Sequence, residues 1–579
     1  MVWNSLLRTY PGLRIVIRRM ATTRMQVPDR QIEPIFKSCL KYKNDVCLRD
    51  SNGDYTFLGL AKSSKRLSVA ITRLTAMRLQ ERVAVICSNN ANLVISQWAC
   101  WISGQIAVPL NPNYPEAVLE YIFKNSSVAL AITTLEHVDK LKNVTQRTKI
   151  ELLVLDTDIT NEAKIGLQVT DEMINPDELN KDLYGQDKDF YNKSDALLMY
   201  TSGSMGKPKG ALLSFKNIDA QINSVISPWL IKSKDCILNA RSLYTTEGIT
   251  AGLLAPFSVG GSVILVEKFK AAEMWSELLG IKKPSFQSST NMNFFIGESW
   301  MYRRLIDEYE TNLKKSGKME EYIKTNCTQK IRLMISMCAP IPRSIHEKWE
   351  AYTGHQLIEV YSITEAGIVS TPTTGTANVF GTVGLPVPSI RMKIIAEDGD
   401  TVIAEGDNSG TKILGVTSPV AGTLLIKGDT LARKYWGKTI DNLWTKDGWF
   451  RTGDIVSYNR GVYNILGKDN CDIVKSKSYK VSLLQIEAAI LDIPSVQDVA
   501  AFHYLQDGNS TIAAAVIMKK GKTLDSNFMR SQLLLRFPDY AVPTIFVNAK
   551  NIPRNHKGSL VRPDIASLYS QLAKLSLVQ

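Results

Sequence analysis

Short, strongly apolar runs alternate with helical stretches along most of this chain, and this alternation limits its possible folds more than any other feature. Runs typical of β-strands are LAITT at 130–134, ELLVLD at 151–156, ALLMYTSG at 196–203 and SVILVE at 262–267. Runs that are apolar on both faces are typical of parallel strands covered by helices on either side. The pattern therefore predicts an α/β fold of layered βα subdomains.

A long stretch without any charged residue, Val83 to Pro115, resembles a membrane segment at first sight. Four polar residues between positions 88 and 92 interrupt it near its start. The stretch is better explained as a buried strand, a polar turn, an apolar helix around Trp98 and Trp101, and a second strand at 106–110. We therefore expect no transmembrane segment.

The first 28 residues are basic and contain no acidic residue, and they also carry serine and threonine. This composition is typical of a mitochondrial transit peptide, whereas a secretory signal fits poorly because arginines interrupt the apolar run LRIVIRR. We expect residues 1–28 to direct the protein to the mitochondrial matrix; the alternative is a cytoplasmic protein with a basic terminus. The arginines are Arg8, Arg14, Arg18, Arg19 and Arg24.

Composition changes along the chain predict its domain organisation. Residues 156–193 are polar and weakly periodic, as expected of a long surface connection, and 314–329 form a charged insert. Gly, Pro, Thr and Val dominate 379–425, which predicts a β-rich subdomain. A boundary follows near Gly467, after which an α+β pattern suffices for a small lobe. The predicted domains are 29–466, a large N-terminal lobe, and 467–579, a small α+β C-terminal lobe.

Charge and cysteine content exclude several classes of function. The net charge of +13 is scattered and lacks the clustered basic stripe of a nucleic-acid-binding protein. The eight cysteines and five histidines show no metal-ligand spacing, and the cysteines are typical of buried thiols in a reducing compartment. No feature of the sequence identifies a protein partner.

The segment YTSGSMGKPKG, from Tyr200 to Gly210, is the strongest local indication of function. It follows an apolar strand and combines glycines, hydroxyl groups and two lysines. Glycines let backbone N–H groups converge on phosphate oxygens, and the lysines add positive charge. The spacing GxxxxGK[ST] is not matched, because Pro208 follows Lys207. The segment predicts a phosphate-binding loop of a different kind.

This loop resembles that of the adenylate-forming superfamily, which includes acyl-CoA synthetases, luciferases and peptide-synthetase adenylation domains. Further similar segments follow in the same order: YSITEAG at 361–367, DGWFRTGDIV at 447–456, LGKDNCDIVKSKSYKVSLLQIE at 466–487 and IPRNHKGSL at 552–560. Other segments, such as QWACWISGQIAVPLNP and EKWEAYTGHQLIE, are similar to the malonyl-CoA and methylmalonyl-CoA synthetase branch. The resemblance implies an AMP-binding domain over 29–466 and a mobile C-terminal domain over 467–579 that rotates about a hinge near Lys468.

The resemblance implies a ligase that uses ATP, Mg²⁺ and CoA. Glu365 would bind Mg²⁺, Tyr361 would stack on adenine and Thr364 would contact the α-phosphate. Asp454 would accept hydrogen bonds from the ribose hydroxyls. The implied catalytic positions are Thr201, Lys209, Glu365, Lys468 and Ser559. The implied nucleotide-binding residues are Thr201, Ser202, Gly203, Ser204, Gly206, Lys207, Lys209, Tyr361, Thr364, Asp454 and Lys468.

The chain departs from the family pattern at its last motif. Ser559 stands where the family has the lysine that bridges the carboxylate and the phosphate during adenylation. Loss of such a group should lower the rate on the order of 10²–10³-fold, by analogy with loss of an oxyanion-hole donor. Lys557 lies two residues earlier and would point to the same face of an extended segment, about 6.6 Å away. Whether Lys557 replaces the missing lysine stays open.

Other departures also fall at positions where the family contacts its ligands. Lys468 replaces an arginine and loses its bidentate fork. Lys477 and Ser478 replace a Gly-Gly pair that lies near the pantetheine arm during thioester formation. Met205 replaces a threonine of the phosphate loop, and Ser362 replaces a glycine.

The acid substrate is open as well. Val360 stands where malonate-type enzymes have an arginine that we take to pair with the second carboxylate. Without it malonate specificity is doubtful, unless Arg241 supplies the positive charge.

Three functions remain compatible with the sequence. The first is an acyl-CoA synthetase that activates a short carboxylic or dicarboxylic acid, of malonate or methylmalonate type, through acyl-AMP to acyl-CoA. The second is a catalytically impaired member of the family that binds a nucleotide or a partner. The third is an adenylating enzyme that passes its acyl group to an acceptor other than CoA.

Overall fold

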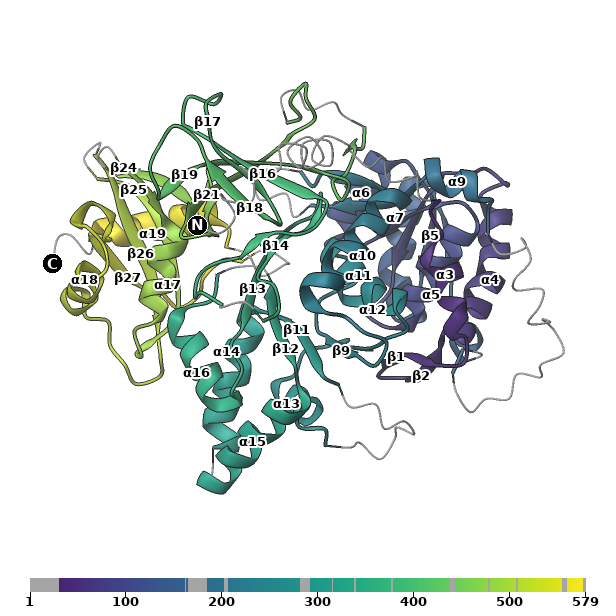
Figure 1. The fold of residues 1–579 in the computed structure, drawn as a ribbon, viewed down its shortest axis with the longest axis horizontal. Helices are drawn as coiled ribbons and strands as arrows, with labels where there is room; N and C mark the ends of the chain where they lie inside the picture. Colours follow the sequence, from purple (N-terminus) through teal and green to yellow (C-terminus); the bar gives the residue numbers. More distant parts are fainter. Residues whose placement is uncertain are drawn as a thin grey trace, which may run out of the picture.

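The computed structural model describes residues 31–161, 163–164, 185–201, 207–281, 292–314, 316–337, 340–375, 378–437, 443–476, 479–506, 509–554 and 560–575. Two large sheets alternate with three layers of helices. A smaller β-rich sheet and a C-terminal lobe lie beside them (Figure 1).

A seven-stranded sheet, to which the first half of the chain contributes every strand except β20, has the order β20-β8-β7-β4-β3-β5-β6. Its centre is parallel, and β8 and β20 extend one edge in antiparallel fashion. Its strands are β3 (Arg82–Ile86), β4 (Ile106–Pro109), β5 (Val128–Thr133), β6 (Glu151–Val154), β7 (Asp195–Tyr200), β8 (Gly210–Ser214) and β20 (Lys434–Tyr435).

A nine-stranded sheet has the order β15-β14-β13-β12-β11-β9-β10-β1-β2. Strands β1, β10, β9, β11, β12 and β13 run parallel, so their carboxyl ends meet at one edge. The strands are β1 (Val46–Asp50), β2 (Gly53–Thr56), β9 (Cys236–Asn239), β10 (Ser262–Leu265), β11 (Phe294–Glu298), β12 (Leu333–Met337), β13 (Ile358–Ile363), β14 (Gly367–Thr371) and β15 (Leu385–Pro386).

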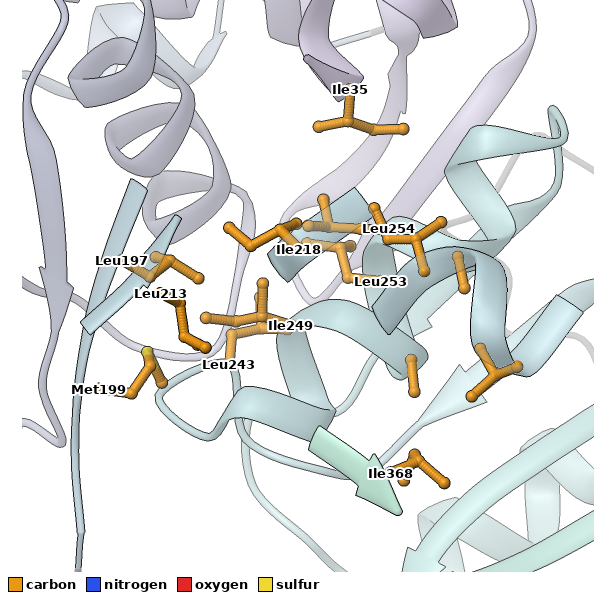
Figure 2. Close-up of a cluster of buried hydrophobic side chains, with 14 of the residues drawn as sticks. Ile35, Leu197, Met199, Leu213, Ile218, Leu243, Ile249, Leu253, Leu254 and Ile368 are labelled. Carbon is orange, nitrogen blue, oxygen red and sulfur yellow. The ribbon is translucent and has the colours of Figure 1, made fainter. Parts of the chain in front are cut away.

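The helices between the two sheets carry the largest apolar core. Helix α5 packs against strands of both sheets, and α10 does the same. Figure 2 shows Leu197 and Leu213 of the seven-stranded sheet near Ile218 of α10. Leu253, from the π-helical turn η4, lies in the same cluster. The helices of this layer are α4 (Phe57–Leu74), α5 (Ala91–Ile102), α10 (Phe215–Trp229), α11 (Thr246–Ile249), the π-helical turn η4 (Thr250–Leu254) and α12 (Ala255–Ser258).

The outer faces of both sheets are covered as well, which explains their continuous apolar runs. In β3, Val83 and Val85 enter the inner core, whereas Ala84 and Ile86 enter the outer one. The seven-stranded sheet is covered by α6 (Glu116–Ser126) and α7 (Val138–Thr148). The nine-stranded sheet is covered by α13 (Ala271–Leu279), α14 (Ser299–Glu308), η5 (Tyr309–Leu313), α15 (Gly317–Lys330) and α16 (Arg343–Thr353). Short helices are α3 (Ile35–Ser38), η1 (Cys39–Tyr42), η2 (Leu135–His137), α8 (Thr157–Asn161) and α9 (Lys188–Lys193).

The β-rich sheet is antiparallel, in the order β18-β17-β16-β19-β21-β22. It confirms the β-rich character predicted for 379–425 but extends to Lys468, because β21 pairs with β19 and β22 pairs with β21. Its strands are β16 (Ile390–Ile395), β17 (Val402–Asp407), β18 (Gly410–Ile413), β19 (Val420–Gly428), β21 (Phe450–Asn459) and β22 (Val462–Lys468).

The C-terminal lobe begins with the hairpin β23 (Ile473–Ser476) and β24 (Tyr479–Ser482). Its three-stranded sheet comprises β25 (Val496–Gln506), β26 (Asn509–Met518) and β27 (Ile545–Asn548). One face packs on α17 (Leu483–Leu491) and α18 (Ser526–Leu534), and the other on α19 (Arg562–Leu575). The short helix η6 (Asp539–Ala541) precedes β27.

The strands and helices expected from the sequence are present, with one correction. The predicted surface connection over 156–193 contains helices at both of its described ends, α8 and α9. Asp187 accepts a hydrogen bond from the Phe190 amide and caps α9, a start that the weak periodicity did not reveal. The predicted leader, 1–28, lies outside the described residues.

Buried positions fit the composition. Trp98 and Trp101 are fully or almost fully buried, as predicted for the apolar helix α5. Six of the cysteines are buried free thiols, Cys471 is half-buried, and Cys338 lies outside the described residues. None of the described helices has the length and apolar content needed to span a bilayer.

Candidate functional site

The two ends of the predicted phosphate loop meet where the hairpin of β7 and β8 closes. The Thr201 amide donates to the Lys209 carbonyl at 2.9 Å, and the Lys209 amide donates to Thr201 Oγ1 at 3.2 Å. The ammonium of Lys207 lies 5.3 Å from the centre of the Tyr121 ring. The structure therefore brings Thr201 and Lys209 together at the two ends of the loop. Ser202, Gly203, Ser204, Met205 and Gly206 lie outside the described residues.

Glu365 lies in the turn between β13 and β14, and only 8% of it is exposed. Its Oε1 accepts a hydrogen bond from the Tyr435 hydroxyl. Among the residues that the structure describes, no other side chain bonds this carboxylate. Burial, together with the neighbouring Glu365 charge, raises the pKa of Tyr435 far above its usual range, so the hydroxyl stays protonated and acts as the donor.

Tyr435 also contacts the phosphate loop. Strand β20 pairs with β8, with Tyr435 opposite Ala211, and the Lys209 ammonium lies 5.6 Å from the centre of the Tyr435 ring. One tyrosine therefore links the loop lysine to the glutamate predicted to bind the metal. The sequence did not reveal Tyr435, because a strand of two residues carries no periodicity.

Tyr361, Asp454 and Lys468 form a second group. The Tyr361 hydroxyl donates to Asp454 Oδ2 at 2.5 Å, and the Lys468 ammonium donates to Asp454 Oδ1 at 3.1 Å. Asp454 and Lys468 are direct partners across β21 and β22, so the strand register creates the ion pair. Asp454 is only 4% exposed.

The charges of this group favour the ionised pair. Burial lowers the pKa of Lys468, but attraction to the Asp454 carboxylate and the hydrogen bond between them more than offset this, so the pKa is raised overall. Burial and the adjacent Asp454 also raise the pKa of Tyr361. Lys468 and Tyr361 both respond to the charge of Glu365, so the two groups share one electrostatic environment.

Thr364 joins the site to the layer of helices between the sheets. Its carbonyl accepts a hydrogen bond of 2.8 Å from Thr246 Oγ1, at the start of α11. The side chain of Val360 is apolar and is buried in the core, so this position supplies no positive charge for a second carboxylate. Arg241 is buried and ion-paired with Glu247 and Glu298.

The remaining predicted residues are not placed. Ser559 and Lys557 lie outside the described residues, as do Lys477 and Ser478. The structure describes their neighbours. Ser476 pairs with Tyr479 in the hairpin of β23 and β24, and the backbones of Arg554 and Leu560 form an isolated antiparallel β-bridge.

Comparisons with known proteins define the class. Residues 35–436 match the family model described as AMP-binding enzyme, and the chain belongs to this family. It is 32% identical over 541 residues to the mitochondrial malonate–CoA ligase ACSF3 of Homo sapiens, covering 91% of this chain and 90% of that protein. It is 27% identical to the malonate–CoA ligase of Arabidopsis thaliana, covering 84% and 77%.

The solved structures confirm the predicted fold class. ATP-bound MatB from Rhodopseudomonas palustris is similar with a TM-score of 0.76 and 20% identity, covering 93% of this chain and 99% of that chain. O-succinylbenzoate coenzyme A synthetase from Bacillus subtilis, in complex with ATP and magnesium ion, gives a TM-score of 0.71 at 18% identity. The resemblance to acyl-CoA synthetases read from the motifs is therefore confirmed for the family and the fold.

Proposed function

We propose that this protein is an ATP-dependent acyl-CoA synthetase that activates a short carboxylic or dicarboxylic acid. The observation that carries the proposal is the arrangement around Tyr435. Its ring lies next to the Lys209 ammonium, and its hydroxyl donates to the Glu365 carboxylate. The Tyr361, Asp454 and Lys468 group shares the same environment. The cation of Lys209, the buried carboxylate of Glu365 and this polar group together suit a nucleoside triphosphate with its metal.

Two steps make up the proposed reaction. A carboxylate oxygen of the acid attacks the α-phosphorus of ATP, and the bond to the bridging oxygen breaks, so pyrophosphate leaves with the electron pair. The CoA sulfur then attacks the acyl carbon of the acyl-AMP. AMP leaves and the thiol proton goes to solvent. Preorganised cations and hydrogen-bond donors stabilise the charge that develops on phosphate.

The donor set fits Mg²⁺. This ion keeps several waters and takes one or two protein carboxylates together with substrate phosphates. Among the described residues no group of three or more potential ligand side chains forms a dedicated metal site, and Glu365 is a buried carboxylate that accepts a hydrogen bond from the Tyr435 hydroxyl. Glu365 would hold Mg²⁺, which neutralises phosphate charge when bound.

The chain's own residues would hold the nucleotide. Thr201 and Lys209 would bind the β- and γ-phosphates together with the loop between them, and Thr364 would approach the α-phosphate. Tyr361 would lie against adenine, and Asp454 would accept from the ribose. Each Asp454 oxygen accepts one bond, from Tyr361 or Lys468, and a carboxylate offers about four acceptor sites, which leaves acceptor sites for the ribose hydroxyls.

A second candidate is a protein that binds the nucleotide without turnover, because Ser559 supplies no cation at the position of the family's lysine. Substitution of Ser559 provides a test of this second candidate. Restoring the charge with Ser559→Lys and Lys468→Arg should raise acid-dependent pyrophosphate release by up to about 10²-fold, the contribution of one strong transition-state donor. A rise from background supports the impaired form, and a rate that is already high in the unchanged protein excludes it.

The direct test measures pyrophosphate release and CoA consumption with ATP, Mg²⁺ and a panel of short acids. Acid-dependent release with matched CoA loss supports the synthetase. Acyl-AMP formation without CoA loss would instead indicate another acyl acceptor, in keeping with Lys477 and Ser478. No release with any acid, while calorimetry still detects ATP binding, would favour the second candidate.

We also propose import into the mitochondrial matrix and a division into 29–466 and 467–579. Residues 1–28 are basic and contain no Asp or Glu, which supports mitochondrial import. The name of the human relative, a mitochondrial malonate–CoA ligase, supports it as well. Fusing residues 1–28 to a fluorescent protein tests import. A cytoplasmic signal would contradict it.

A further inference from the structure

The loop after β9 and the end of β11 lie at the edge of the sheet that carries the candidate site. Strands β9, β11, β12 and β13 are parallel, so their carboxyl ends share this edge. Arg241 lies two residues beyond β9, and Glu298 is the last residue of β11. Tyr361 and the turn with Glu365 lie at the end of β13. Ligands of open α/β sheets bind at this edge.

Helix α11 fixes a third charged residue at the same place. It packs on β13 and β14, and its first residue, Thr246, donates to the carbonyl of Thr364. Glu247 follows directly. Gly248 permits the close contact with the loop that holds Arg241, since a Cβ there would stand 2.1 Å from the Ser242 carbonyl oxygen. Figure 2 shows Ile249 of this helix and Leu254 of the π-helical turn η4 that follows it within the apolar core.

Arg241 is shared between two carboxylates. Its Nε donates to Glu247 Oε1 at 2.9 Å, Nη2 contacts the same oxygen, and Nη1 lies 2.5 Å from Glu298 Oε1. The side chains of Arg241, Glu247 and Glu298 are 10%, 6% and 14% exposed. The guanidinium is therefore shared between two acids, and the formal charges of the three ionised groups sum to −1.

We propose that the Arg241–Glu247–Glu298 cluster determines acid specificity, selecting short acids whose far end is neutral or cationic and disfavouring dicarboxylates. The proposal rests on the synthetase function above. A second carboxylate that approaches a poorly solvated cluster of net negative charge is repelled, and this repulsion is several times stronger than in water. Val360, apolar and buried, brings no compensating cation from β13.

Matched acids of equal length test this proposal without any variant. The kcat/KM for acid-dependent AMP formation is measured for propionate, β-alanine and malonate, and for isobutyrate and methylmalonate. We expect each monocarboxylate to exceed its dicarboxylate by at least about tenfold, the scale of one like-charge contact at a partly buried site. Equal or preferred use of the dicarboxylates overturns the inference while leaving the synthetase function intact. No AMP with any acid removes the function itself.

A double variant assigns the effect to the cluster. Glu247→Gln with Glu298→Gln leaves Arg241 without these carboxylate partners, so the malonate-to-propionate ratio of kcat/KM should rise at least about tenfold. Glu120→Gln is the control. It removes a carboxylate at the surface that pairs with Lys124 and Arg147, and it should leave the malonate-to-propionate ratio unchanged. A purely structural role for the cluster would lower kcat/KM for both acids equally, and an unchanged ratio in the double variant rejects the proposal.

Discussion

Tyr435 connects two parts of the candidate site that lie far apart in the sequence. Its ring lies under the Lys209 ammonium, and its hydroxyl donates to Glu365. A tyrosine suits this place because the ring attracts a cation while the raised pKa keeps the hydroxyl a donor. Because Glu365 is the carboxylate proposed to hold Mg²⁺, we expect Tyr435 to affect metal affinity without touching the metal.

Tyr435→Phe tests this role. It keeps the ring but removes the donor to Glu365, so the Mg²⁺ concentration that half-saturates ATP binding should rise about tenfold, the effect expected for an outer hydrogen-bond partner. Calorimetric titration of ATP at graded Mg²⁺ measures it and does not require turnover. Tyr121→Phe is the matched control, because its ring lies under Lys207 and its hydroxyl bonds the Pro208 carbonyl. Identical Mg²⁺ dependence in both variants would contradict the role.

At the scale of secondary-structure elements, the helix from 246 to 258 positions Thr246 and Glu247. It widens into a π-helical turn at Thr250–Leu254, a local deviation often found beside functional sites. Asn239 at the end of β9 donates to the Gly248 carbonyl at 3.3 Å. The helix therefore has a fixed place against both the loop of Arg241 and the turn of Glu365.

Gly248→Ala should disrupt this contact. Its Cβ would stand 2.1 Å from a backbone oxygen, so the helix or the loop must shift at a cost of about 1–3 kcal/mol in the free energy of unfolding. Denaturant unfolding measures the change. Gly317→Ala, at the first residue of α15 with open space around it, should be neutral or stabilising by up to about 1 kcal/mol. Equal effects of the two alanines would refute the close contact.

The elements themselves could largely be predicted from the sequence, but the contacts between them could not. Strands such as β3 are apolar on both faces because both faces are buried, and periodicity detects this directly. Thr201 and Lys209 could be proposed as site residues from the sequence because they lie in one continuous loop. The pairing of Arg241 with Glu298 joins residues 57 positions apart, and Tyr435 meets Glu365 across 70, so no local pattern contains them.

At the scale of the whole molecule, polar contacts join the C-terminal lobe to the outer helices of the nine-stranded sheet. Asp492 Oδ1 accepts from the Ser344 amide at 2.8 Å, near the N-terminus of α16. Next to Asp498, the Gln497 carbonyl accepts from Arg303 of α14 at 2.8 Å. Asp498 itself lies 4.0 Å from Arg303 and bonds Arg554 at 2.8 Å. Figure 1 shows α17 beside α16 at this junction.

These contacts should set the orientation of the lobe that carries Ser559. Replacing both acids, Asp492→Ala with Asp498→Ala, removes the acceptor for the Ser344 amide and the carboxylate that lies 4.0 Å from Arg303. Amide hydrogen exchange near residue 344 should then accelerate at least about tenfold, since local opening is no longer opposed by these bonds. Asp525→Ala provides the control: Asp525 caps α18 within the same lobe and has no interlobe contact among the described residues. Because salt screens the attraction between these carboxylates and their partners, 1 M NaCl should accelerate exchange at the same peptide in the unchanged protein. Protection at α16 that survives both the double variant and high salt would show that apolar packing, rather than these carboxylates, holds the lobe in place.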